Sequence, residues 1–127
     1  MKVILVDAYH TLFTEKWLDL EIKKILDSFK NKKIVLTNAN DEQIISFGID
    51  KSPYEVFTLK HNPNKNNVKY FEFFLKKFNF KYKDLVYFEH NIDVVKIANS
   101  IGIKSYYFDK DKRDLLQLRK FLENNLN

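Results

Sequence analysis

The sequence contains no cysteine, which excludes disulfide bonds, thiolate catalysis and cysteine-ligated zinc. Glycine and proline occur only twice each, and no linker, internal repeat or low-complexity tract is present. Long hydrophobic runs are also missing. The apolar stretch near Met1 is too short for a membrane span and lacks the small-residue cleavage site of a secretory signal. We therefore expect a cytoplasmic protein that begins at or near Met1 and has no membrane partner.

The residues that are abundant provide the material for a folded core. Hydrophobic residues make up 45% of the 127 positions and aromatic residues 16%, which is enough for one domain to fold alone. The net charge of +5 is carried mostly by lysines scattered over the chain, and only two arginines occur. A basic surface can attract phosphates, but this scatter is typical of a solvated lysine face, so a nucleic-acid partner is not expected.

Short apolar runs alternate with longer amphipathic segments along the chain. The short runs predict strands at 2–6, 33–36, 54–59, 85–88 and 103–108. Apolar residues at helical spacing predict a first helix capped by Thr14, then helices at 41–47, 66–78 and 91–101, and a last helix with a core stripe of Leu115, Leu118, Phe121 and Leu122. This alternation predicts an α/β fold: a Rossmann-like, doubly wound, mostly parallel five-stranded sheet with helices on both faces.

Polar side chains stand at the ends of several predicted strands. Asp7 follows the first strand, Thr37 and Asn38 end the second, Glu89 follows the fourth, and Lys65 lies just before the long middle helix. Taken singly, Asp7 fits a turn and Thr37 fits the end of a strand. In a parallel sheet, however, these groups converge at one edge. A carboxylate nucleophile, a hydroxyl and an ammonium group at that edge match the needs of phosphoryl transfer through an aspartyl-phosphate.

Four segments, in order along the chain, resemble the motifs of the haloacid dehalogenase superfamily. Residues 3–12 are similar to the first motif, 34–38 to the second and 86–91 to the fourth, and Lys65 keeps the spacing of the family's lysine. The resemblance covers nearly the whole chain and implies a Rossmann-like core with an aspartate nucleophile. The stretch between the first two motifs has room for only one helix, so the resemblance implies a single domain, residues 1–127, without a cap domain.

The resemblance also implies a role for each residue of this site. Asp7 is the nucleophile, and Thr37 and Lys65 hold the phosphate. Mg²⁺ is the implied cofactor, with the carboxylates of Asp7 and Glu89 and the carbonyl of Tyr9 as three of its ligands. The remaining candidates are His10 as proton carrier and Tyr9, Thr11 and Asn38 as substrate contacts.

Two parts of the family's pattern are altered. The second aspartate of the family's phosphatases, two residues after the nucleophile, is here Tyr9, and a phenol is a poor base at neutral pH. His10 beside it titrates in a range that suits proton transfer, although a lone histidine in a turn is often incidental. In the fourth motif the usual acidic pair is Glu89 followed by His90, with Asp93 one helical turn further on. Imidazole suits a transition metal better than Mg²⁺, so these changes weaken the expected metal site.

Two classes of function remain. In the first, the chain is a capless phosphohydrolase of low activity that acts on a phosphorylated small molecule or macromolecule, with a partner protein serving as a lid. In the second, it is a noncatalytic relative that binds a phosphorylated ligand or a partner protein. The missing acid favours weak or no turnover, whereas Asp7, Thr37 and Lys65 favour a retained anion site. Lys60 is a weaker candidate than Lys65 because its distance to the following helix does not match. Dehalogenation needs an enclosed pocket, which a capless chain does not provide.

Overall fold

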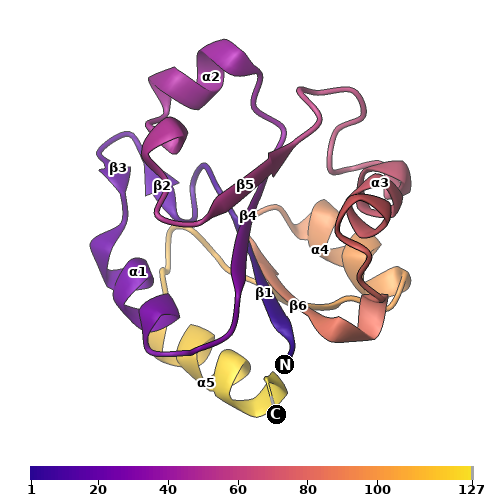
Figure 1. The fold of residues 1–127 in the computed structure, drawn as a ribbon. Helices are drawn as coiled ribbons and strands as arrows, with labels where there is room; N and C mark the ends of the chain where they lie inside the picture. Colours follow the sequence, from indigo (N-terminus) through magenta and orange to yellow (C-terminus); the bar gives the residue numbers. More distant parts are fainter. Residues whose placement is uncertain (127) are drawn as a thin grey trace.

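The computed structural model describes residues 1–126 and has a central sheet of five parallel strands (Figure 1). The strands follow the spatial order β5-β4-β1-β6-β7, so β1, the first in the chain, lies in the middle. Every neighbouring pair is parallel, which confirms the predicted α/β sheet. The strands are β1 (Val3–Asp7), β4 (Lys33–Thr37), β5 (Glu55–Thr58), β6 (Leu85–Glu89) and β7 (Lys104–Tyr107), and a separate antiparallel pair consists of β2 (Phe13–Thr14) and β3 (Trp17–Leu18).

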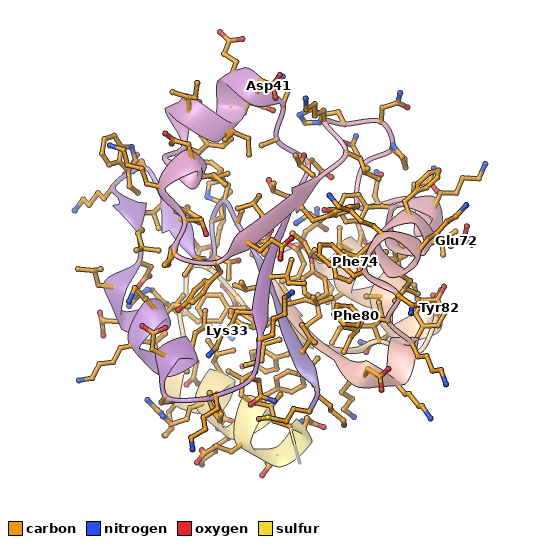
Figure 2. The ribbon with its side chains drawn as sticks, in the orientation of Figure 1. Lys33, Asp41, Glu72, Phe74, Phe80 and Tyr82 are labelled. Atoms are coloured by element: carbon orange, nitrogen blue, oxygen red, sulfur yellow. The ribbon has the colours of Figure 1, made fainter. Side chains whose placement is uncertain are left out.

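Helices cover both faces of the sheet, as predicted (Figure 1). Ile4 and Val6 of β1 belong to the core beneath α1 and α5, whereas Val3 and Leu5 belong to the core beneath α3 and α4, because successive side chains of a strand point to opposite faces. Figure 2 shows Phe74 between α3 and the sheet. None of the helices in residues 1–126 is long and apolar enough to cross a lipid bilayer. The helices are α1 (Leu20–Asp27), α2 (Asp41–Ser46), α3 (Val68–Phe78), α4 (Ile92–Ser100) and α5 (Leu115–Asn125), with short 3₁₀ helices η1 (Ile49–Lys51) and η2 (Tyr82–Asp84).

The first helix begins later than the sequence predicts. The cap was expected at Thr14, but the chain there forms the short β2–β3 pair. Trp17, expected on the helix, has a left-handed φ of 70° and is half exposed, and this backbone conformation is incompatible with a helix. Asp19 is the actual N-cap, and its carboxylate accepts hydrogen bonds from two backbone N–H groups of the first turn of α1. The predicted start was wrong because Trp17 belongs to a hairpin.

The turns on either side of α2 hold this helix near the carboxyl ends of the strands. Asn40 and Gln43 form a capping box at its start, each side chain accepting from the other residue's backbone N–H. Gly48 follows its end with a left-handed φ of 76°, as the sequence predicts. A Cβ at Gly48 would lie 2.9 Å from Cγ of Trp17, so the glycine also allows the β2–β3 hairpin to approach.

Candidate functional site

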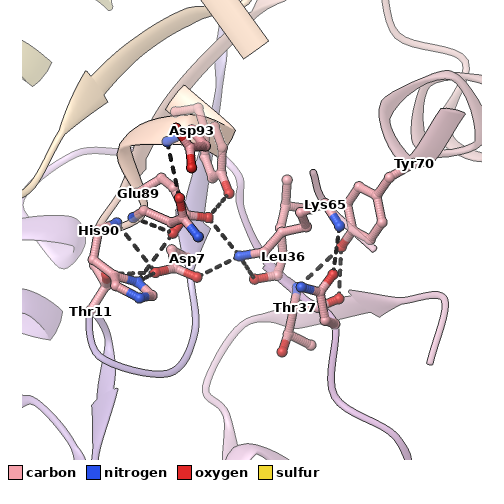
Figure 3. Close-up of polar contacts among 12 residues, drawn as sticks. Asp7, Thr11, Leu36, Thr37, Lys65, Tyr70, Glu89, His90 and Asp93 are labelled. Atoms are coloured by element: carbon pink, nitrogen blue, oxygen red, sulfur yellow. Dashed lines mark hydrogen bonds and ion pairs between the residues drawn. The ribbon is translucent and has the colours of Figure 1, made fainter. Parts of the chain in front are cut away.

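The side chains predicted to converge do meet at one edge of the sheet (Figure 3). Asp7, Thr37 and Glu89 are the last residues of β1, β4 and β6, which are adjacent in the sheet. Lys65 reaches them from the loop between β5 and α3. All four residues are buried, with exposed fractions between 0 and 5%. Charged groups at this depth are stable only when they are paired and hydrogen-bonded.

Lys65 joins the two buried carboxylates. Its Nζ donates to Oδ1 of Asp7 at 2.5 Å and to Oε1 of Glu89 at 2.6 Å. Burial alone lowers the pKa of Lys65, but the two carboxylates outweigh burial and raise that pKa above its usual value. Lys60, the competing lysine, instead forms a solvent-exposed ion pair with Asp41 at 3.0 Å. The structure therefore brings Lys65 to the site and leaves Lys60 outside it.

The second oxygen of Asp7 is held by two other groups. Oδ2 accepts a hydrogen bond from Oγ1 of Thr11 at 2.7 Å and another from Nδ1 of His90. Burial raises the pKa of Asp7, but the ammonium of Lys65 and the bond from His90 outweigh burial and hold that pKa well below its usual range. Burial lowers the pKa of His90, but its hydrogen bonds to Asp7 and Glu89 raise it to about 9. At neutral pH, Asp7 is therefore ionised and His90 is protonated.

A pocket of about 150 Å³ opens above these groups. Thr11 supports Asp7 and is not among the residues that line the described pocket. Asn38 accepts the backbone N–H of Lys65 at 2.7 Å, so it also fixes the loop that carries the lysine. The predicted site residues that line the pocket are Asp7, Tyr9, His10, Thr37, Asn38, Lys65 and Glu89. The catalytic and binding roles assigned to these residues and to Thr11 stay predictions.

Aromatic rings form one wall of the pocket. Tyr9 stacks on Phe47, with ring centroids 4.1 Å apart and an angle of 11° between the planes. The ring of His10 lies 4.2 Å from that of Tyr9 and 5.2 Å from that of His90. Burial and the positive charges of Lys110 and His90 lower the pKa of His10. His10 is therefore largely neutral at pH 7 and can accept a proton.

The end of β4 is fixed by a buried tyrosine. The hydroxyl of Tyr70 donates to the carbonyl of Thr37 at 2.9 Å and accepts from its backbone N–H at 3.1 Å. Oγ1 of Thr37 accepts the backbone N–H of Ala39, which leaves its hydroxyl hydrogen to donate to an anion in the pocket. Figure 3 shows Tyr70 and Thr37 on the side of Lys65 opposite Asp7.

Gln43, Phe47 and His61 are among the lining residues that sequence reasoning missed. The two ring nitrogens of His61 lie 2.6 Å from Oε1 of Gln43 and 2.9 Å from Oδ1 of Asn64. Lys60 and His61 both have left-handed backbones, with φ of 53° and 67°, and this conformation turns the loop toward the pocket. Lysine and histidine seldom adopt that conformation, so no signal in the sequence could have placed His61 at the pocket.

Three neighbouring side chains have the spacing of a metal site. Asp7, Glu89 and His90 each offer a ligand atom, and these atoms lie within 4.8 Å of one another. Asp93, considered as a further ligand, is exposed in the first turn of α4 and lies outside this group. Metal binding by the carbonyl of Tyr9 stays a prediction.

Comparisons with known proteins support the fold. No family model and no curated protein matches the sequence. The chain is similar to the crystal structure of an uncharacterized protein from Corynebacterium glutamicum ATCC 13032, with a TM-score of 0.65 and 14% sequence identity. The match covers 97% of this chain and 96% of that one. At this identity the likeness shows the Rossmann-like fold alone, and function has to be argued from the site.

Proposed function

We propose that the chain is a phosphohydrolase of the haloacid dehalogenase type that forms an aspartyl-phosphate on Asp7. The observation that carries the proposal is an ionised, buried carboxylate in an open pocket, with the ammonium of Lys65 2.5 Å away. The hydroxyl of Thr37 lines the same pocket, so a bound phosphoryl group has donors close to its oxygens. The four segments that resemble the superfamily's motifs support the same assignment.

In the first step, an oxygen of Asp7 attacks the phosphorus of a phosphate monoester, and the bond from phosphorus to the ester oxygen breaks. Oδ1 is the better nucleophile because it accepts one side-chain hydrogen bond, from Lys65, whereas Oδ2 accepts one from Thr11 and another from His90. The leaving oxygen takes a proton from the imidazolium form of His10. The products of this step are the free alcohol, the aspartyl-phosphate and neutral His10.

In the second step, water attacks the phosphorus of the aspartyl-phosphate. The bond from phosphorus to Asp7 breaks, the carboxylate is regenerated, and inorganic phosphate leaves. The proton lost by the water passes to His10, which returns to its starting form.

His10 limits the rate of the first step. Its lowered pKa leaves little imidazolium at neutral pH, so a proton for the leaving group is scarce. Tyr9, at the position of the family's second aspartate, stacks on Phe47 and supplies no carboxyl group. Turnover is therefore slow, and weakly basic leaving groups such as 4-nitrophenolate are preferred.

The size of the pocket restricts how a substrate binds. Its volume of about 150 Å³ is below the range of roughly 300–1,000 Å³ that encloses drug-sized ligands. The phosphoryl group fits inside while the rest of the substrate stays outside. Such a site suits a phosphorylated macromolecule, or a phosphorylated small molecule covered by a partner protein that acts as a lid.

The donor set does not fit Mg²⁺, the cofactor that the resemblance implies. Asp7 and Glu89 supply oxygen ligands, but the third member of the group is a ring nitrogen of His90. Mg²⁺ prefers six oxygen ligands in octahedral geometry, whereas imidazole nitrogen suits transition ions. No step of the proposed reaction passes through a metal ion.

A second function is favoured by the stacking of Tyr9 on Phe47. With no acid beside the nucleophile, the same pocket would bind a phosphorylated ligand without hydrolysing it. Lys65 and Thr37 would hold the anion in both cases.

Release of 4-nitrophenol from 4-nitrophenyl phosphate tests the proposal. We expect slow turnover by the wild-type protein and at least a hundredfold loss in Asp7→Asn. Asp41→Asn, which changes an exposed carboxylate at the start of α2, is the matched control and should keep wild-type turnover. A wild-type protein that binds inorganic phosphate through Lys65 but releases no product would favour the binding function. Equal turnover in wild type and Asp7→Asn would refute the aspartyl-phosphate mechanism.

A further inference from the structure

The carboxylates of Asp7 and Glu89 are joined by nitrogen donors on both sides (Figure 3). On one side, Nζ of Lys65 contacts Oδ1 and Oε1 at 2.5 and 2.6 Å. On the other side, Nδ1 of His90 is hydrogen-bonded to Oδ2 of Asp7 and lies 3.1 Å from Oε2 of Glu89. The ring nitrogen of His90 thus lies at the point between the two carboxylates where a shared divalent ion would bind.

The protein supplies a hydrogen-bond donor to each of the four carboxylate oxygens. Besides Lys65 and His90, Oδ2 of Asp7 accepts from Thr11, Oε1 of Glu89 from the hydroxyl of Tyr87, and Oε2 of Glu89 from the backbone N–H of Asn91. Carboxylate oxygens only accept, so Nδ1 of His90 carries the hydrogen in this contact. A metal ion would have to displace that hydrogen and break at least one of these bonds.

Burial strengthens this argument. The side chains of Asp7 and Glu89 are 3% and 0% exposed, and that of His90 is 24% exposed. In such a position a lost hydrogen bond is not replaced by water at low cost. The carboxylates are therefore already neutralised and hydrogen-bonded by the protein's own groups.

We propose that His90 takes the place of a divalent cation, so that the pocket binds a phosphoryl group without a metal. The choice of a phosphoryl ligand rests on the proposed function, whereas the replacement of the cation rests on the contacts of His90 alone. His90 acts here as a positioning residue: it holds Asp7 and Glu89 side by side and leaves Oδ1 of Asp7 facing Lys65.

The alternative is a transition ion bound by Asp7, Glu89 and His90 together. That ion would lie about 2.0–2.2 Å from each ligand atom and would separate the ring nitrogen from both carboxylates. In the structure, Nδ1 is instead in direct hydrogen-bond contact with Asp7. The hydrogen-bonded arrangement leaves no space for an ion on the line between these two atoms.

Metal titration separates the two arrangements. EDTA-treated wild-type protein and His90→Asp are titrated with MgCl₂, MnCl₂ and ZnCl₂ by calorimetry. His90→Asp places a third carboxylate where the imidazole was, so we expect it to bind Mg²⁺ at least tenfold more tightly than the wild type. His61→Asp, which adds a carboxylate at another pocket histidine, is the matched control and should gain no Mg²⁺ affinity.

A second measurement uses inorganic phosphate as the ligand. We expect phosphate to raise the melting temperature of the wild type equally with EDTA and with 5 mM MgCl₂, and to do so in His90→Asp only with MgCl₂. One-to-one binding of Mn²⁺ or Zn²⁺ to the wild type at micromolar concentration, lost in His90→Asn, would overturn the inference. So would a wild-type phosphate shift that disappears in EDTA.

These outcomes separate the inference from the proposed function. If phosphate binds to no variant, the proposed function fails while the metal titration still decides the role of His90. If His90→Asp does not fold, as judged by circular dichroism, the wild-type and His90→Asn titrations still decide it.

Discussion

Replacing Lys65 by methionine removes the one lysine that neutralises the buried carboxylates of the described site. The side chains of Lys65, Asp7 and Glu89 are 6%, 3% and 0% exposed, so water cannot take over the role of the ammonium. Methionine keeps most of the side-chain volume, and the cost therefore comes from the lost charge. After the change, His90 is left as the partner of two carboxylates.

The expected cost is set by this uncompensated charge. Removing one partner of a buried ion pair typically destabilises a protein by about 3–5 kcal/mol. Against a total stability of about 5–15 kcal/mol, this loss is a large fraction. For a chain of this length it corresponds to a fall in melting temperature of roughly 10–20 °C.

Urea denaturation followed by circular dichroism measures the effect. Lys60→Met is the matched control: its ion pair with Asp41 is solvent-exposed, so the change should cost less than about 1 kcal/mol. The double variant Lys65→Met/Glu89→Gln removes one carboxylate charge together with the ammonium. It should therefore be more stable than the sum of the two single effects predicts.

One result would refute this reasoning. If Lys65→Met costs no more than Lys60→Met, the ammonium is not what stabilises Asp7 and Glu89. The same conclusion would follow if the two single effects simply added in the double variant.

Three further predictions concern the groups around the site. The pKa of His90 is raised to about 9, so the stability contributed by the protonated imidazole is complete below pH 6.5 and is lost as the pH rises through 9. In EDTA, urea denaturation should therefore show that the wild-type free energy of unfolding falls between pH 7 and 10 by on the order of 2 kcal/mol more than that of His90→Asn. Tyr70→Phe leaves the buried carbonyl and N–H of Thr37 without their partner and should cost about 1–3 kcal/mol in the same assay, and a cost near zero would show that β4 does not need this bond. Gly48→Ala combines a left-handed φ with a Cβ 2.9 Å from Trp17, so its melting temperature should fall further than that of Gly102→Ala, where the φ is 99° and the nearest atom is 3.6 Å away; equal losses would mean that Trp17 moves freely.

The sequence predicts the sheet and the convergence of Asp7, Thr37 and Glu89 for one physical reason. Buried parallel strands are read from short apolar runs, and strands that run parallel end at the same edge. A residue that ends such a run is therefore assigned to that edge without knowledge of the connecting loops. The boundaries of β6 and α4 follow from the same pattern, within one or two residues.

The remaining features depend on backbone conformations that residue type does not reveal. Trp17, Lys60 and His61 adopt left-handed conformations that such residues seldom take. The hairpin and the loop that brings His61 to the pocket follow from these conformations. The contacts of His90 were missed for another reason: its side chain was judged as a metal ligand, whereas its contacts with Asp7 and Glu89 depend on a rotamer that only the packed site fixes.

The contacts of Lys65 also limit how strongly the pocket can hold a phosphoryl group. An ammonium group has three N–H donors. Two of them are directed at Asp7 and Glu89 at 2.5 and 2.6 Å, while the carbonyl of Leu36 lies 3.5 Å away, too far for a strong hydrogen bond. The third donor is therefore the one that a ligand oxygen can take without breaking an ion pair. Because two-thirds of the donors stay with the protein's own carboxylates, Lys65 binds an incoming phosphate through one strong contact, and most of the remaining affinity has to come from Thr37 and from the backbone around the pocket.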